Sequence, residues 1–329
     1  MIIHFLGKGP ANQISGGYLY NHYVLDYLAA VGYSVRYHED STRLDVIDGN
    51  DCVIVDSLVL YESAEVLLTM ACRTVLLLHV VPDTSKSPSK HITIKPGVLE
   101  SLYARSLIVV TGNDSLRQVR RCFPNLHLNA VCLEPGVPAN WREKKEHSDS
   151  ANNLLCIANY ADYKGHRELF QCLEALRDLN WTLNVFGNTN IQPGFYDDLS
   201  EQVSQHECAG RICCRAEIAH NDVNQQMLKS DLLIHLSEHE SYSMVIAEAI
   251  ASGLPVFSYR TGNHEVFGTS GLVRYIDDLD TDNVCTELRK IMAHPPAYAR
   301  LRRNATWKRR DWNDVGRDFA RLLEERLWN

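Results

Sequence analysis

Short runs of β-branched residues and leucine alternate along this chain with longer segments whose apolar residues recur every three or four positions. Such alternation is typical of strand–helix–strand units whose strands form a parallel sheet. The first series contains six predicted strands and a predicted helix near 18–30. These strands cover residues 2–6, 34–37, 52–55, 74–79, 107–110 and 129–133.

A second series of the same kind fills the C-terminal half of the chain. Its predicted strands cover residues 154–158, 183–186, 211–214, 232–236 and 255–259. Between the two series, residues 134–152 lose the periodicity and carry Pro, Gly and mixed charges, which is typical of a linker. We therefore expect an α/β protein with two doubly wound, Rossmann-like domains facing a central cleft, an N-terminal one over 1–147 and a C-terminal one over 148–307.

The composition supports two packed domains and limits the classes of partner. The 329 residues are 45% apolar and 22% charged, which is enough for two hydrophobic cores. A net charge of -8 opposes binding to nucleic-acid phosphates, so no nucleic-acid partner is expected. The ten cysteines include no C-x-x-C pair, which favours reduced thiols over zinc sites or disulfides.

The chain shows no sequence signal for crossing or passing a membrane. No apolar run approaches the ~20 residues that span a bilayer, and the N-terminus lacks the pattern of a signal peptide. We therefore expect a cytoplasmic protein. Two basic clusters, Arg117, Arg120 and Arg121 and residues 300–310, leave peripheral contact with the inner face of the cytoplasmic membrane open. Solvated helix faces and salt bridges between domains are the simpler interpretation of both clusters.

Open parallel sheets bind ligands beyond the carboxyl ends of their strands, so the candidate chemistry is sought in those loops. After the first strand, Gly16 and Gly17 open a helix, where backbone amides can approach an anion or a sugar closely. A flexible loop is the alternative. His79 ends the fourth predicted strand, and its position leaves a structural and a functional role open.

The most informative segment is 231–265, which predicts strand, turn, helix, strand and loop. Glu240 lies in the turn, and Glu248 lies inside an apolar helix, where an unpaired carboxylate is costly. Carboxylates accept hydrogen bonds from vicinal hydroxyls, so this pair suits recognition of a ribose and a sugar. Residues 241–244 form the helix entry, where free amides are able to bind phosphate.

Two further patterns bear on an anionic ligand. Lys164 and Gly165 follow the first strand of the second series at the start of a helix, where a lysine is able to neutralise a diphosphate. The acidic run 275–282 has D-x-D spacings, but it is better explained as the cap of a helix starting near Asn283. No metal site is therefore expected.

Together these motifs resemble the retaining glycosyltransferases of family 4, which have the GT-B fold, over most of the chain. The family's E-x7-E motif is matched at Ser237, Glu240, Glu248, Ala249, Ala251, Gly253, Pro255 and Val256. Its glycine-rich acceptor-side loop corresponds to Gly16–Gly17, and its K-G pair corresponds to Lys164–Gly165. Its P-x-G-V stretch corresponds to Glu134–Val137, and its late G-G-x-x-E segment corresponds to Thr261, Gly262 and Glu265. Residues 308–329 resemble the family's C-terminal helix, which packs back near the domain junction.

The resemblance implies transfer of a sugar, a hexose in our expectation, from a UDP- or GDP-linked donor, with retained anomeric configuration and without a metal or other cofactor. Glu240 is implied at the donor sugar, Lys164 at the departing diphosphate and His79 near the reacting sugar; Glu248 is implied to hold the ribose hydroxyls. The other implied donor-binding positions are Ser241, Tyr242, Ser243, Met244, Asn159, Arg167, Gly187 and Ile218.

One departure from the family pattern keeps other functions open. Asn159 occupies the position of an arginine that the family usually carries, and Arg167, one turn after Lys164, is the candidate replacement cation. A noncatalytic nucleotide-sugar binding protein and a non-hydrolysing sugar-nucleotide epimerase are the alternatives. The expected acceptor is a glycan, a lipid-linked glycan or a small molecule, in polysaccharide or glycoconjugate synthesis; the sequence predicts no oligomeric state.

Overall fold

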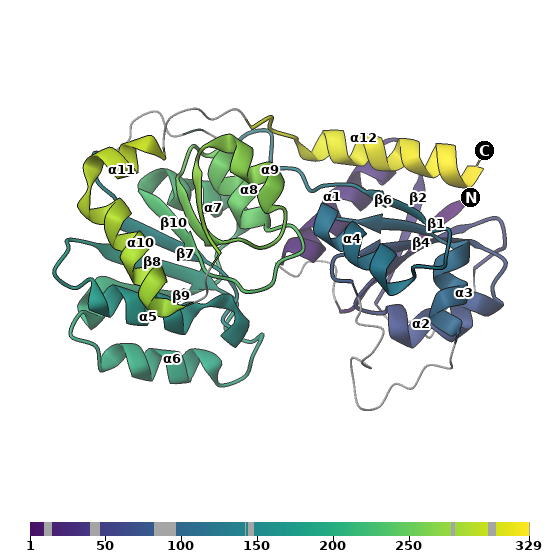
Figure 1. Ribbon diagram of the computed structural model, residues 1–329. Helices are drawn as coiled ribbons and strands as arrows, with labels where there is room; N and C mark the ends of the chain where they lie inside the picture. The colour runs from purple at the N-terminus through teal and green to yellow at the C-terminus, as the bar shows by residue number, and fades with distance from the viewer. Residues whose placement is uncertain are drawn as a thin grey trace. The chain divides into compact units, whose positions relative to one another are not determined.

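The structure is a computed structural model that describes residues 1–9, 15–39, 47–81, 97–141, 143, 148–277, 280–301 and 307–328. The chain divides into two compact units (Figure 1). The N-terminal unit comprises Met1–Gly136 and Arg310–Asn329, and the C-terminal unit comprises Val137–Arg309. Each unit is an α/β layer structure built on one six-stranded parallel sheet, as the sequence predicts for its fold class.

The division between the units falls at Gly136, earlier than the 147 expected from the sequence. Val137 and Trp141 are buried in the core of the C-terminal unit, which explains why the segment after Gly136 belongs to it. Arg309 donates hydrogen bonds to the carbonyl oxygens of Pro138 and Trp141, so the end of this unit is tied to its beginning.

The N-terminal sheet has the strand order β2-β1-β3-β4-β5-β6. Its strands are β1 (Ile2–Leu6), β2 (Ser34–His38), β3 (Cys52–Asp56), β4 (Arg73–Leu78), β5 (Leu107–Val110) and β6 (Asn129–Cys132). Its helices are α1 (Gly16–Ala30), α2 (Leu60–Thr69), α3 (Val98–Arg105), α4 (Asn113–Cys122) and α12 (Trp312–Leu323), which continues into a π-helical turn, η5 (Glu324–Trp328).

The C-terminal sheet has the strand order β12-β11-β10-β7-β8-β9. Its strands are β7 (Asn153–Ile157), β8 (Thr182–Gly187), β9 (Ile212–Ala216), β10 (Leu232–His235), β11 (Val256–Tyr259) and β12 (Val273–Ile276). Its helices are α5 (His166–Ala175), α6 (Phe195–Ser204), α7 (His220–Lys229), α8 (Met244–Ala251), α9 (His264–Phe267), α10 (Thr281–Ala293) and α11 (Pro295–Arg300), with short 3-10 turns η2 (Asp162–Lys164), η3 (Ala209–Arg211) and η4 (Gly268–Ser270).

The strands are continuous apolar runs because both faces of each sheet are covered. In β7, Leu154 and Cys156 point into the core shared with α5, α6 and α10, whereas Leu155 points into the core shared with α7 and α8. These two helix layers lie on opposite faces of the sheet (Figure 1). In the N-terminal unit, Val53 and Val55 of β3 face α2, α3 and α4.

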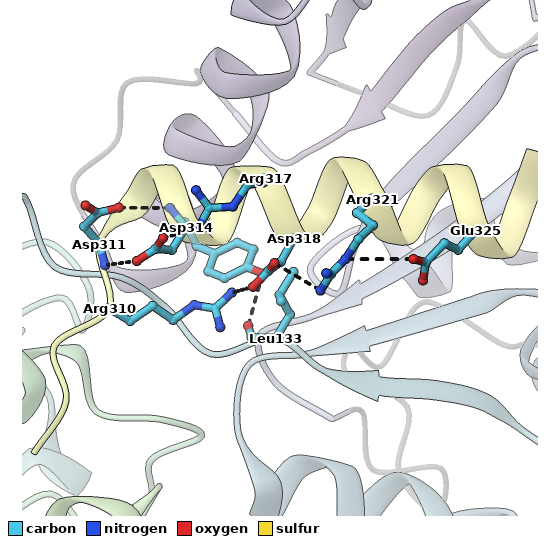
Figure 2. Close-up of polar contacts among 9 residues, drawn as sticks. Leu133, Arg310, Asp311, Asp314, Arg317, Asp318, Arg321 and Glu325 are labelled. Atoms are coloured by element: carbon cyan, nitrogen blue, oxygen red, sulfur yellow. Dashed lines mark hydrogen bonds and ion pairs between the residues drawn. The ribbon is translucent and has the colours of Figure 1, made fainter.

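Helix α12 belongs to the N-terminal unit and lies beside α1 (Figure 1). Asp311 caps it: its carboxylate accepts from Asp314 N at 2.9 Å, and the Asp314 carboxylate accepts from Asp311 N at 3.3 Å (Figure 2). Gly316 permits the close approach to α1, because a Cβ there would lie 2.2 Å from Tyr27 Cγ. The capping box thus starts the helix, and the lack of a side chain at Gly316 lets the helix pack against α1.

The sequence missed one strand of the C-terminal sheet. Strand β12 is an edge strand that pairs only with β11, and Arg274 in its middle is exposed, so no apolar run marks it. The acidic segment before α10 lies partly outside the described residues. The helix begins at Thr281 with Asp280 as its N-cap residue, two residues before Asn283, and Asp280 makes no side-chain capping hydrogen bond.

Three sequence expectations about the whole chain can be compared with the structure. All ten cysteines are free thiols. Within the described ranges, no helix has the length and apolar character needed to span a bilayer. Of the two basic clusters, Arg120 and Arg121 are exposed on α4, whereas Arg310 pairs with Asp318 at 2.6 Å; residues 302–306 lie outside the described residues.

Candidate functional site

The strand order of each sheet locates the place where a ligand is expected. In the C-terminal sheet the order reverses between β7 and β10, and a crevice for ligands forms at such a switch point, beyond the carboxyl ends of the two strands. Lys164 follows β7, and Glu240 follows β10. The topology therefore brings two of the predicted site residues to the same edge of the sheet.

Lys164 and Glu240 are in direct contact. Lys164 Nζ donates a hydrogen bond of 2.7 Å to Glu240 Oε1, and each side chain is only 15% exposed. His235, the last residue of β10, places its Nε2 3.1 Å from the same carboxylate oxygen. Glu240 thus has two nitrogen partners on one oxygen, in a partly desolvated site.

The surroundings keep Glu240 ionised. Burial alone would raise the pKa of this carboxyl, but the charge of Lys164 and the hydrogen bond from His235 outweigh burial and hold the pKa below its ordinary value of 4.5. At neutral pH the group is a carboxylate that only accepts hydrogen bonds. Such a group suits a polyhydroxylated ligand.

Two glycines shape the backbone around this carboxylate. Gly165 has φ +73°, and a Cβ there would lie 2.2 Å from Leu236 O, so the loop after β7 approaches the loop after β10 without a side chain between them. Gly262 has φ +62°, and a Cβ there would lie 3.1 Å from Glu240 Cβ. The K-G pair and the late glycine segment therefore have a steric reason to contain glycine.

Helix α8 begins directly after Glu240. Ser243 is its N-cap residue and Met244 its first residue, so the amides that have no partner within the helix start here, as expected from the sequence. Ser241 is half-buried. Tyr242 is 3% exposed and packs in the apolar core with its ring centroid 5.1 Å from that of Phe267, so its side chain serves packing.

Glu248 lies in the interior of α8 and is 5% exposed. Its Oε1 is 2.7 Å from Nε2 of His220, the first residue of α7. The His220 ring in turn lies against Trp141, with 5.3 Å between ring centroids. This pairing satisfies a carboxylate that the sequence had already marked as too costly to bury alone.

The remaining donor-side positions surround the loops after β7, β8 and β9. Asn159 Oδ1 accepts from Asn188 N at 3.4 Å. Arg167 pairs with Asp162 at 3.5 Å, and its guanidinium lies 5.0 Å from the centre of the Phe195 ring. Gly187 ends β8, where a Cβ would lie 2.0 Å from Ala158 O, and Ile218 packs against the core of α7 and α8. These positions stay predictions as donor contacts.

The N-terminal unit brings its own candidates together at its switch point, between β1 and β3. Gly16 and Gly17 begin α1, and a Cβ on Gly17 would lie 3.0 Å from His79 Cδ2. The His79 Nε2 is 2.8 Å from Asn21 Oδ1, and Asn21 Nδ2 donates to Asp56 Oδ2 at 2.7 Å. Burial lowers the pKa of His79, although the Asp56 carboxylate opposes this shift. Residues 10–14 of the glycine-rich loop lie outside the described residues.

Four polar residues of these two clusters were missed from the sequence: His235, His220, Asn21 and Asp56. Asp56 ends β3 and directly follows the predicted strand 52–55, so a search of strand ends for polar side chains would have found it, whereas His235 lies inside the predicted strand 232–236. Asn21 lies in the second turn of α1 and His220 begins α7, and the sequence carries no local signal for their partners. Within the part of the chain that the structure describes, no group of three His, Cys, Asp or Glu side chains is arranged to hold a metal ion.

Comparison with known proteins gives a fold and a family. Sucrose-phosphate synthase from Thermosynechococcus elongatus matches with a TM-score of 0.78 and 13% identity, covering 98% of each chain. Anabaena HepE in complex with UDP and glucose matches with a TM-score of 0.76 and 16% identity, covering 98% of this chain and 99% of that chain. At such identities the likeness shows the fold, which is GT-B, as the resemblance implied.

The family assignment comes from sequence. The lipopolysaccharide glucosyltransferase WaaG of Escherichia coli (strain K12) is 26% identical over 182 residues, which is 50% of this chain and 44% of WaaG. The match thus spans less than half of that curated relative. The family described as glycosyl transferases group 1 matches residues 138–307, which is just over half of the chain and includes Lys164, Glu240 and Glu248. The chain therefore belongs to the glycosyl transferases group 1.

Proposed function

We propose that this protein is a retaining glycosyltransferase that moves a hexose from a nucleotide diphosphate sugar to a hydroxyl acceptor. The observation that carries the proposal is the contact of Lys164 with Glu240 at the switch point of the C-terminal sheet, within the segment that matches the family. One cation and one carboxylate with hydrogen-bonding capacity to spare suit a ligand that carries a diphosphate beside a polyol.

The roles follow from the donors and acceptors of each side chain. The Lys164 ammonium group has three N–H donors. One of them donates to Glu240, so two remain for diphosphate oxygens. Charge on the leaving diphosphate grows as the bond from the anomeric carbon to its oxygen breaks, and a preorganised cation stabilises that charge. Glu240 would accept a hydrogen bond from the donor sugar, and Glu248, held by His220, from the ribose.

The donor class is proposed from relatives. HepE has been solved with UDP and with UDP-glucose, and WaaG is named a glucosyltransferase, so UDP-glucose is the first donor to try. We propose a reaction without a metal or other cofactor, a glycan, lipid-linked or small-molecule acceptor, and a cytoplasmic location. Contact of the exposed Arg120 and Arg121 with a membrane surface stays a prediction.

The test is release of UDP from UDP-glucose, with UDP-galactose, UDP-N-acetylglucosamine and GDP-mannose as comparisons, in the presence and absence of sugar acceptors and of a chelator. The proposal expects one donor to be consumed with chelator present, Lys164→Met and Glu240→Gln to abolish turnover, and the product to keep the donor's anomeric configuration by NMR. Donor binding without turnover would favour a noncatalytic binding protein. A rearranged nucleotide sugar formed without acceptor would favour an epimerase.

A further inference from the structure

Ser243 has a backbone conformation that serine rarely adopts. Among the residues that the structure describes, it is the only one other than glycine in the left-handed region, with φ 75° and ψ 71°. This conformation costs free energy in a residue that has a Cβ and little in glycine. The residue is 4% exposed, so contact with solvent does not explain a serine here. Strain of this kind is characteristic of functional sites.

The hydroxyl of Ser243 has a specific neighbour. Its Oγ lies 3.1 Å from Nε2 of His235, the same nitrogen that lies 3.1 Å from Glu240 Oε1. Because a carboxylate only accepts hydrogen bonds, Nε2 must carry the proton that points toward Glu240. Ser243 Oγ then acts as a second acceptor for the same N–H. Glu240 therefore sets the tautomer of the His235 ring, and the left-handed backbone places a hydroxyl that helps to hold the ring in one orientation.

The two oxygens of Glu240 are consequently unequal. Oε1 receives hydrogen bonds from Lys164 and from His235, whereas no described residue donates to Oε2. The Lys164 ammonium group lies at the end of a long, flexible side chain, and in the proposed reaction it also binds the diphosphate. His235 is 4% exposed at the end of β10 and has only two side-chain torsions, so it is the more rigid of the two partners.

From this geometry we propose that Ser243 and His235 are positioning residues that fix Glu240 through Oε1, so that Oε2 accepts a hydrogen bond from a hydroxyl of the donor sugar. The inference rests on the proposed function and deepens it. It assigns the recognition of the sugar, as distinct from that of the nucleotide, to a four-residue chain of Ser243, His235, Glu240 and Lys164. Neither Ser243 nor His235 touches the reacting atoms in this account.

The decisive variant is Ser243→Gly, because it relieves the backbone and removes the hydroxyl at once. We expect its Tm to rise while kcat with UDP-glucose falls roughly tenfold, the effect of one hydrogen bond in a charged network. Affinity for UDP alone should change less than kcat, because Ser243 and His235 act on Glu240, which is assigned to the sugar. Ser230→Gly is the matched control: Ser230 is equally buried in the same unit but has φ −98°, so its Tm should fall and its kcat should not change.

Conservative replacement separates positioning from packing. His235→Gln keeps a side-chain N–H donor and should retain most of kcat, whereas His235→Leu, of similar volume, should lose it about as fully as Glu240→Gln. A Ser243→Gly variant with a raised Tm and an unchanged kcat would overturn the proposal. Equal activity of the Gln and Leu variants at His235 would overturn it as well.

A spectroscopic measurement keeps this inference separate from the proposed function. If the wild-type protein turned over no nucleotide sugar, the proposed function would fail, yet long-range proton–nitrogen NMR of His235 would still decide the geometry. We expect the Nε2–H form in the wild type, because that proton points toward Glu240 Oε1. An Nδ1–H form in the wild type would contradict the assigned chain.

Discussion

Replacing Lys164 with methionine removes one of the two hydrogen-bond donors to Glu240 and leaves the carboxylate in a site where it is 15% exposed. Removing one partner of a fully buried ion pair lowers the free energy of unfolding by about 3–5 kcal/mol. His235 remains 3.1 Å away as a second donor, so we expect the lower cost of a lost charged hydrogen bond, about 2–3 kcal/mol. At about 2–4 °C per kcal/mol for a unit of this size, the Tm should fall by about 4–12 °C.

Removing both charges should restore most of that stability. The double variant Lys164→Met, Glu240→Gln buries no uncompensated charge. Its free energy of unfolding should therefore lie within about 1 kcal/mol of that of the wild type. The double-mutant cycle then gives a coupling energy near 2 kcal/mol. The assay is urea unfolding of the four proteins at pH 7 with calorimetric Tm values. Additive effects of the two single substitutions would refute the assigned ion pair.

The same cycle has a defined pH dependence. The folded-state pKa of Glu240 is held below its ordinary value of 4.5, so its contribution to stability is present above that value and is lost as the pH falls toward the folded-state pKa. The stability difference between wild type and Lys164→Met should therefore shrink between about pH 5 and pH 3. A difference that stays constant over this range would show that Lys164 stabilises the protein by packing alone.

Three further predictions test the surrounding structure. Gly165→Ala forces a Cβ toward Leu236 O at φ +73° and should cost more than about 2 kcal/mol in urea unfolding, whereas Gly210→Ala, with open space around its Cβ, should cost almost nothing. Asp56→Asn removes the charge that raises the pKa of His79, so NMR titration should show His79 titrating at a lower pH than in the wild type. Asp311→Ala breaks the capping box of α12 and should destabilise the N-terminal unit by about 1 kcal/mol.

Much of the fold was predictable because parallel sheets covered on both faces produce apolar runs. Strand β3, CVIVD, is buried at every position and was found from its composition alone. Strand β12 was missed because an edge strand with an exposed arginine lacks that signal. The two units divide after Gly136, inside the predicted linker 134–152, because Val137 and Trp141 pack into the C-terminal unit through tertiary contacts that a linker-like composition does not reveal.

The two glutamates of the candidate site stand out in the sequence, but their partners do not. Glu248 stands out in an apolar helix, and Glu240 stands eight residues before it. Nothing in the run DLLIHLS distinguishes His235 from a core histidine, and a serine in sequence gives no sign of a left-handed backbone. Asn21, Asp56 and His79 come from three distant segments and meet beside the N-terminal sheet. The order of the strands brings them together, and the local sequence does not reveal that order.

The most direct measurement of the central claim is calorimetric titration of UDP and of UDP-glucose into the wild type, Glu248→Gln and Glu240→Gln, with Glu201→Gln, at an exposed position of α6, as control. The account predicts that Glu248→Gln weakens both ligands, that Glu240→Gln weakens UDP-glucose about tenfold and leaves UDP unchanged, and that Glu201→Gln changes neither. Tight binding of both ligands that is insensitive to Glu240 and Glu248 would contradict it, as would the absence of binding to the wild type.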